Sequence, residues 1–298
     1  MKILLTGATG SIGGAVLSAL IENGHEVTCP IRSLSKVSNL TASALIHFIE
    51  LDSSLDDYTK FNQLAQGFPC IIHTGFAMFA KDAEQETNIT RGLLEAAKAQ
   101  SAHEKITFIF TSEAHVIGPT DYLVSDDNVT TECCEDFCRY RVEHENLVLS
   151  YSNENFAASV VRPCWVYGGS FVDLWFSNCK KHGKIVVPER PGKITFIHKE
   201  DLGVIYRLVA ENAGRGCYVA SEGQGPEIDE LIELNKRLTG VTVVERVQDV
   251  MPYVDDFSFT VIGLTLKCSV DSTRAKNEFG FEPNYNLMRD GERLLKID

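Results

Sequence analysis

A glycine-spaced turn near the start of the sequence constrains the fold more than any other feature. The apolar run 3–5 is typical of a strand buried on both faces, and a helical pattern starts near Ala15. Gly7, Gly10 and Gly13 lie between them. Glycines in such a turn permit the bend, let backbone N–H groups approach a pyrophosphate, and let the helix pack closely on the strand. The pattern predicts a dinucleotide site, although a tight turn that binds nothing would have the same spacing.

Strands and helices alternate along the rest of the chain. We expect further strands at 26–31, 44–51, 70–76, 105–111 and 157–162, and helices at 15–21, 55–64, 87–97, 201–211 and 227–238. This alternation predicts an α/β fold with a doubly wound parallel sheet, a Rossmann fold. Residues 1–165 would form the dinucleotide-binding core. Residues 166–298 would form mainly a smaller substrate lobe, with some elements returning to the core.

Composition excludes several classes of function. The chain has 28 basic and 41 acidic residues, a net charge of −13, which repels nucleic acid and anionic membranes. It has no apolar run near the roughly 18 residues of a membrane helix and no secretory signal pattern. We therefore expect a cytoplasmic monomer or homodimer that acts on a small molecule. Four possible metal ligands cluster at Cys133, Cys134, Cys138 and His144, but they lack a paired second half-site, so we expect no metal.

The end of the second expected strand bears on the choice of cofactor. Arg32 follows this strand directly, Lys36 lies close behind it, and no acidic residue stands at this point. An acidic residue there would bind the ribose 2′-hydroxyl of NAD, whereas cations favour the 2′-phosphate of NADP. The sequence thus favours NADP(H). The alternative is that both cations decorate a solvated loop.

Several motifs together make the chain resemble the extended short-chain dehydrogenase/reductase superfamily, which includes sugar-nucleotide epimerases and dihydroflavonol reductases. The resemblance covers nearly the whole length. Its motifs are 6–13 (Thr-Gly-Ala-Thr-Gly-Ser-Ile-Gly), 72–76 (Ile-His-Thr-Gly-Phe), 110–112 (Phe-Thr-Ser), 161–168 (Val-Arg-Pro-Cys-Trp-Val-Tyr-Gly), 196–202 (Phe-Ile-His-Lys-Glu-Asp-Leu) and 272–283 (Ser-Thr-Arg-Ala-Lys-Asn-Glu-Phe-Gly-Phe-Glu-Pro).

The resemblance also implies which residues would contact the cofactor. They are Gly7, Thr9, Gly10, Ser11, Ile12, Gly13, Arg32, Asp52, Ser53, Thr74, Gly75, Phe76, Thr111, Arg141, Pro163 and Val166. Lys36 is added to this set on its charge.

The superfamily's catalytic residues do not carry over. It uses a serine after the fifth strand and Tyr-x-x-x-Lys on the next helix, and here Glu113, Phe137 and Arg141 stand at those positions. An alternative alignment uses Tyr140-x-x-x-His144, which keeps a phenol and still lacks the lysine. Arg141 and the following residues also resemble an atypical branch with Arg-x-x-His/Ser-Glu in place of Tyr-x-x-x-Lys.

Phe137 has no proton to give to a developing alkoxide, so the usual carbonyl reduction needs another donor. His144 would share a helical face with Arg141, and an ordinary pKa near 6.5 suits a general acid; it could equally be a structural helix residue. We expect little activity toward simple aldehydes and ketones. We also expect Glu113 and Arg141 to form a salt bridge.

Three functions remain open from the sequence. The first is an NADP(H)-dependent oxidoreductase on a small carbonyl or alcohol, with a non-standard proton donor. The second is an isomerase or lyase that uses the same cleft, and the third is a catalytically silent NADPH sensor. Five aromatic residues favour an enzyme because they lie in segments expected to wall a substrate cleft, unless they are ordinary core: Phe79, Tyr122, Phe171, Trp175 and Phe176.

Overall fold

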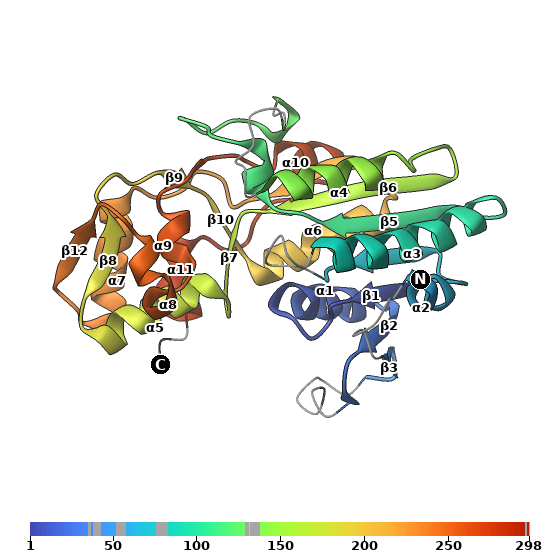
Figure 1. The fold of residues 1–298 in the computed structure, drawn as a ribbon, viewed down its shortest axis with the longest axis horizontal. Helices are drawn as coiled ribbons and strands as arrows, with labels where there is room; N and C mark the ends of the chain where they lie inside the picture. Colours follow the sequence, from blue (N-terminus) through green and yellow to red (C-terminus); the bar gives the residue numbers. More distant parts are fainter. Residues whose placement is uncertain are drawn as a thin grey trace. The chain divides into compact units, whose positions relative to one another are not determined.

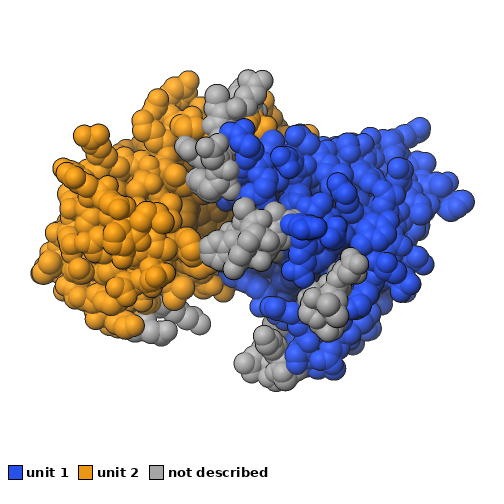
Figure 2. Space-filling view, viewed as in Figure 1, with its two compact units in different colours: residues 1–113, 136–162, 202–218 blue, residues 114–135, 163–201, 219–298 orange. Residues whose placement is uncertain are grey.

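A computed structural model describes residues 1–34, 37, 43–51, 58–75, 83–128, 131, 138–295 and 297. The chain divides into two compact units that alternate along the sequence (Figure 2). The first unit comprises Met1–Glu113, Asp136–Arg162 and Leu202–Tyr218, and the second comprises Ala114–Glu135, Pro163–Asp201 and Val219–Asp298. We expected one boundary near residue 165 with later elements returning to the core. By contacts, residues 202–218 belong to the first unit and residues 114–135 to the second.

A seven-stranded sheet confirms the predicted α/β fold. Its order is β11-β6-β5-β4-β1-β2-β3, and the pairs along β6-β5-β4-β1-β2-β3 are parallel. The strands are β1 (Lys2–Thr6), β2 (Glu26–Ile31), β3 (Ile46–Glu50), β4 (Cys70–His73), β5 (Ile106–Thr111), β6 (Phe156–Pro163) and β11 (Gly216–Ala220). Because β4, β5 and β6 are buried on both faces, their sequences are nearly continuous apolar runs.

Helices of the first unit form a layer on each face of this sheet (Figure 1). They are α1 (Ser11–Glu22), α2 (Tyr58–Leu64), α3 (Ala83–Ser101), α4 (Arg139–Leu149) and α6 (Lys199–Glu211). Helices α3 and α4 bury Leu94 and Val148 against sheet residues such as Phe108. Helix α6 approaches α1 so closely that a Cβ on Gly203 would lie 2.6 Å from the Ala15 carbonyl oxygen.

Short parallel strand pairs and helices build the second unit. The pairs are β7 (Trp165–Tyr167) with β10 (Phe196–His198), β8 (Ile185–Pro188) with β12 (Val244–Val247), and β9 (Lys193–Ile194) with β13 (Lys267–Cys268). The helices are α5 (Phe171–His182), α7 (Ile228–Thr239), α8 (Val254–Phe257), α9 (Thr260–Gly263), α10 (Thr273–Phe279) and α11 (Leu287–Leu294), with 3-10 turns η3 (Ala114–Ile117), η4 (Asp126–Asn128) and η6 (Met251–Tyr253).

The core of the second unit corrects part of the expected cleft wall. Trp175 and Phe176 are 1% and 0% exposed and belong to this core, because α5 packs them against β8 and α7. Phe171 and Tyr122 are 37% and 72% exposed, so of the described candidates only these two present aromatic surface to solvent. Phe79 lies outside the described residues.

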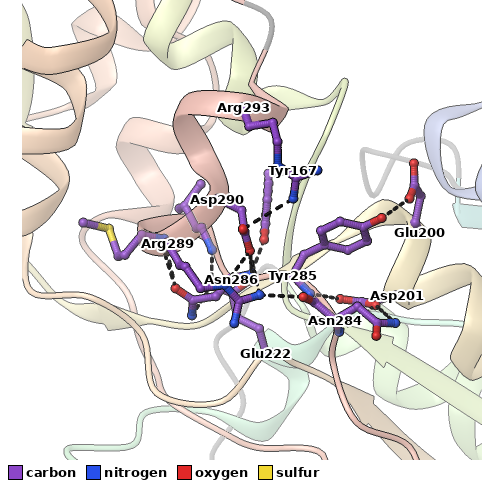
Figure 3. A network of polar contacts seen from close by, with 12 residues as sticks. Tyr167, Glu200, Asp201, Glu222, Asn284, Tyr285, Asn286, Arg289, Asp290 and Arg293 are labelled. Atoms are coloured by element: carbon purple, nitrogen blue, oxygen red, sulfur yellow. Dashed lines mark hydrogen bonds and ion pairs between the residues drawn. The ribbon is translucent and has the colours of Figure 1, made fainter.

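Two acidic side chains hold the C-terminal segment in the second unit (Figure 3). Asp201 is fully buried and accepts hydrogen bonds from the backbone N–H groups of Asn284 and Tyr285. Glu222 accepts from the Tyr167 hydroxyl at 2.8 Å and from the Leu287 N–H at 3.0 Å. These bonds fix the start of α11. None of the described helices is long and apolar enough to cross a membrane.

Candidate functional site

The glycine turn at the end of β1 has the geometry that its spacing predicts. Gly7 has a φ of +77°, which favours glycine, and its carbonyl accepts the Gly10 N–H at 2.9 Å. A Cβ on Gly13 would lie 2.1 Å from the Gly7 carbonyl oxygen. Helix α1 therefore starts against the turn at a distance that no side chain at position 13 would allow.

The N-terminus of α1 fits an anionic group. Its N-cap is Gly10, no side chain of the described residues caps it, and its first turn contains no acidic residue. Free N–H groups and the helix dipole both favour a pyrophosphate at this point. The turn lies between β1 and β4, where the strand order reverses, which is the usual ligand crevice of an open α/β sheet. The residues thus fit a dinucleotide cofactor.

Thr74 and Gly75 shape the other side of this crevice. The Thr74 hydroxyl donates to the Thr6 carbonyl at 2.7 Å and ties the end of β4 to the end of β1. A Cβ on Gly75 would lie 2.9 Å from the ring of His73. The hydrogen bond from Thr74 to Thr6 therefore fixes the two strand ends that border the crevice.

The other expected cofactor residues fall into four groups. Thr9, Ser11 and Arg32 are exposed and Ile12 is half-buried, whereas the Thr111 hydroxyl is buried 2.6 Å from the Tyr206 hydroxyl. Pro163 and Val166 belong to the second unit. Lys36, Asp52, Ser53 and Phe76 lie outside the described residues.

Helix α4 brings two of the catalytic candidates together. Arg141, His144 and Val148 are buried on it, which confirms the predicted shared face; Phe137 lies outside the described residues. The Arg141 guanidinium is fully buried and forms an ion pair with Glu86 of α3. Sequence reasoning missed Glu86, because nothing in the sequence links positions so far apart. The pair with Glu113 stays a prediction.

His144 differs from the general acid that we expected. Its side chain is buried, and Nε2 lies 2.5 Å from the Thr87 hydroxyl. Burial, with the nearby charges of Arg141 and Arg91, lowers the pKa of His144 to about 4. The ordinary pKa assumed from the sequence is thus wrong, and His144 is neutral at pH 7.

Tyr140 is more accessible than Arg141 and His144 on the same helix. It is half-buried at the first turn of α4, and the Arg141 guanidinium lies 5.2 Å from its ring centre and donates a hydrogen bond to its hydroxyl. Burial raises the pKa of Tyr140, the Arg141 charge opposes this rise, and the Glu113 carboxylate adds to it. A partly exposed phenol therefore lies beside a buried cation, with Glu113 nearby.

Two further buried groups were missed from the sequence. His73 ends β4 with Nδ1 2.6 Å from the Thr6 hydroxyl, and burial lowers the pKa of His73 to about 3. Arg162 of β6 makes a two-pronged ion pair with Glu145 of α4, at 3.0 and 2.6 Å. His73 and Arg162 lie in the motifs 72–76 and 161–168, but the bond or ion pair that each makes depends on a contact between elements and could not be read from the sequence.

The possible metal cluster is only partly described. Cys138 is buried and His144 is bonded to Thr87, while Cys133 and Cys134 lie outside the described residues. Within the described ranges, no group of three or more His, Cys, Asp or Glu residues could hold a metal ion.

Comparison with known proteins assigns the family. The sequence model of the NAD dependent epimerase/dehydratase family matches residues 3–218. The chain belongs to this family. Membership confirms the resemblance to extended short-chain dehydrogenases/reductases and supports a nicotinamide dinucleotide as cofactor.

Two relatives match this chain over nearly its full length. The uncharacterized protein YLL056C of Saccharomyces cerevisiae is 29% identical over 300 residues, 95% of each chain. A 3-diazoavenalumate denitrifying reductase of a Streptomyces species is 24% identical over 98% of this chain and 99% of its own.

A solved structure of low sequence identity shares the fold. A dTDP-glucose 4,6-dehydratase of Bacillus anthracis in complex with NAD covers 99% of this chain and 95% of its own, with a TM-score of 0.80 and 15% identity.

Proposed function

We propose that the protein is an NADP(H)-dependent oxidoreductase of a small organic carbonyl or alcohol, with Tyr140 as the proton donor. The contact between Tyr140 and Arg141 carries this proposal. Tyr140 is half-buried and has a phenol to donate, whereas Arg141 is fully buried and His144 is buried, neutral and bonded to Thr87. The expected lack of activity toward simple carbonyls depended on Phe137, and Tyr140 supplies the missing proton.

The residues around Tyr140 suit proton transfer. When bound, the cofactor supplies a hydride to a carbonyl carbon or accepts one from an alcohol. Tyr140 gives its phenolic proton to the substrate oxygen as negative charge develops there. Arg141 then stabilises the phenolate through its charge and its hydrogen bond to the phenol oxygen. Water returns the proton to Tyr140.

Arg32 supports the choice of NADP(H) over NAD. It is exposed and follows β2 directly, at the strand end where an α/β dinucleotide site meets the ribose. A charged contact with the 2′-phosphate contributes about 1.5–3 kcal/mol. We expect NADPH to bind more tightly than NADH, and Arg32→Ala to remove most of the difference, as measured by calorimetric titration. Equal affinities in the wild-type protein would contradict the preference.

Substitution of the phenol tests the proposed donor. With NADPH and a panel of aldehydes and ketones, Tyr140→Phe should lower kcat by about 10²–10⁴, the range for a lost general acid. The affinity for NADPH should stay the same, because the cradle of the cofactor is unchanged.

Tyr151→Phe is the matched control. It removes a phenol that bonds to Glu95 just beyond α4, and it should leave kcat unchanged. A full rate in Tyr140→Phe would exclude Tyr140 as donor. NADPH binding without turnover of any carbonyl or alcohol would instead favour a sensor.

A further inference from the structure

Two consecutive residues of α3 hold the two side chains of α4 that contact Tyr140. The Glu86 carboxylate forms the ion pair with Arg141, and the Thr87 hydroxyl lies 2.5 Å from Nε2 of His144. The Arg141 guanidinium carbon lies 5.2 Å from the ring centre of Tyr140, and the His144 ring meets the same ring edge to face at 6.0 Å. Helix α3 therefore fixes the surroundings of the proposed proton donor.

The ion pair between Glu86 and Arg141 is closed to solvent. The side chain of Arg141 is 0% exposed and that of Glu86 is 4% exposed. The guanidinium also packs over the Phe110 ring of β5, 5.9 Å from its centre. Because water screens such charges weakly, each acts strongly on its neighbours. The sum of the charges beside Tyr140, and not the presence of one cation, thus decides whether the phenol keeps its proton.

This sum does not favour a phenolate. In the described part of the chain, the titratable groups that face Tyr140 are Arg141 and His144 of α4, Glu86 of α3, and Glu113 just after β5. His144 is neutral at pH 7, so one cation stands against two carboxylates. Burial raises the pKa of Tyr140 most. Arg141 lowers this pKa and the carboxylates of Glu113 and Glu86 raise it, and the result lies above the ordinary value of 10.0.

We infer that Glu86 sets the site for reduction, because its carboxylate offsets the Arg141 charge beside Tyr140 and so keeps the proton on the phenol. The substrate is then a carbonyl compound, and NADPH is the form of the cofactor that is consumed. This inference rests on the proposed function, which includes both a carbonyl and an alcohol. Glu86 acts through Arg141 and is thus a positioning residue.

The two directions of the reaction need opposite protonation states of Tyr140. In reduction, the carbonyl carbon gains a hydride from NADPH and the carbonyl oxygen gains the phenolic proton, which leaves an alcohol, NADP⁺ and a phenolate that takes up a proton from water. Oxidation of an alcohol needs the phenolate first, as the base that removes the hydroxyl proton. With a phenol pKa of about 10 or more, at most about one molecule in a thousand holds a phenolate at pH 7. Reduction therefore starts from the state in which the protein rests.

Ultraviolet absorbance tests the protonation of Tyr140 without a substrate. The difference between alkaline titrations of wild-type and Tyr140→Phe proteins reports this phenol alone, and we expect it to stay protonated to about pH 10. In Glu86→Gln, compared with the Glu86→Gln/Tyr140→Phe double variant, Tyr140 should ionise about one pH unit or more lower, because the Arg141 charge is no longer offset. Glu84→Gln, at an exposed site two residues earlier on α3, should match wild type.

The pH dependence of turnover gives a second readout. For the carbonyl that the wild-type protein reduces fastest in the panel of aldehydes and ketones, kcat/KM should stay level from about pH 6 to 9. For oxidation of the corresponding alcohol, kcat/KM should rise about tenfold per pH unit over the same range. In Glu86→Gln both profiles should bend about one pH unit or more lower than in wild type. Damage to the fold alone would lower both profiles without moving the bend.

Two results would overturn the inference: a wild-type titration midpoint for Tyr140 below about 10, or the same midpoint in wild type and Glu86→Gln. If Glu86→Gln does not fold, the wild-type titration and the wild-type pH profiles still decide. The proposed function fails separately. A full rate in Tyr140→Phe, or no turnover in either direction, contradicts the proposed function. Reduction that depends on Tyr140, with an unshifted profile in Glu86→Gln, contradicts only the role of Glu86.

Discussion

Buried histidines give the first unit a defined response to acid. His144 and His73 are 4% and 2% exposed, and each has a ring nitrogen with no hydrogen-bond partner in the described part of the chain. Both imidazoles therefore resist protonation while the protein is folded. An unfolded chain accepts these protons near pH 6.5.

This difference predicts a loss of stability at low pH. Because the folded-state pKa of His144 is about 4, its contribution is complete above about pH 6.5 and is lost as pH falls toward 4, by about 3 kcal/mol in total. In urea unfolding at pH 5 and 7.5, His144→Gln should show a smaller difference between the two pH values than wild type. His103→Gln, at an exposed site, should match wild type. An unchanged pH dependence in His144→Gln would contradict the lowered pKa.

The sequence predicts features that lie within one strand or helix, and it misses those that depend on contacts between elements. The expected strand at 26–31 coincides with β2, because its sequence alone marks it as buried. The face of α4 that holds Arg141 and His144 follows from helical periodicity. The partner of Arg141 does not, because Glu86 lies on α3 and only the folded sheet brings the two helices together. For the same reason Tyr140 could not be preferred over His144, since their burial depends on that packing.

At the scale of the elements, loss of one partner of the ion pair between α4 and β6 should lower the free energy of unfolding strongly. Glu145 and Arg162 have side chains 2% and 6% exposed. Glu145→Gln would leave Arg162 with a buried charge and should lower the free energy of unfolding by about 3–5 kcal/mol. Glu278→Gln removes a more exposed partner of Arg274 on α10 and should cost about 0.5 kcal/mol or less. Urea titrations compare the two, and equal losses would show that burial does not set the strength of the pair.

At the scale of the whole molecule, hydrogen bonds to two acidic side chains with raised pKa values hold distant segments of the second unit together. Burial raises the pKa of Glu222 to about 7, and burial also raises the pKa of Asp201. These groups connect β7, the first turn of α6 and the start of α11, which lie far apart in the sequence (Figure 3).

A raised carboxyl pKa gives the opposite pH dependence to that of the histidines. The Glu222 contribution is complete below its unfolded pKa near 4.3 and is lost as pH rises through about 7. Glu222→Gln cannot ionise, so its Tm should fall less than that of wild type between pH 5 and 8. Glu189→Gln, at an exposed site of the same unit, should follow wild type. A parallel fall in Glu222→Gln and wild type would exclude Glu222 as the source.

The alternation of the two units along the chain also sets an order of events during synthesis. The first unit needs residues 202–218, which follow two segments of the second unit, and its sheet gains β11 only from this late segment. A ribosome must therefore have released the chain beyond residue 218 before the nucleotide-binding sheet can close. Until then β6 has an unpaired edge, and a nascent chain that stalls earlier would expose it to other chains.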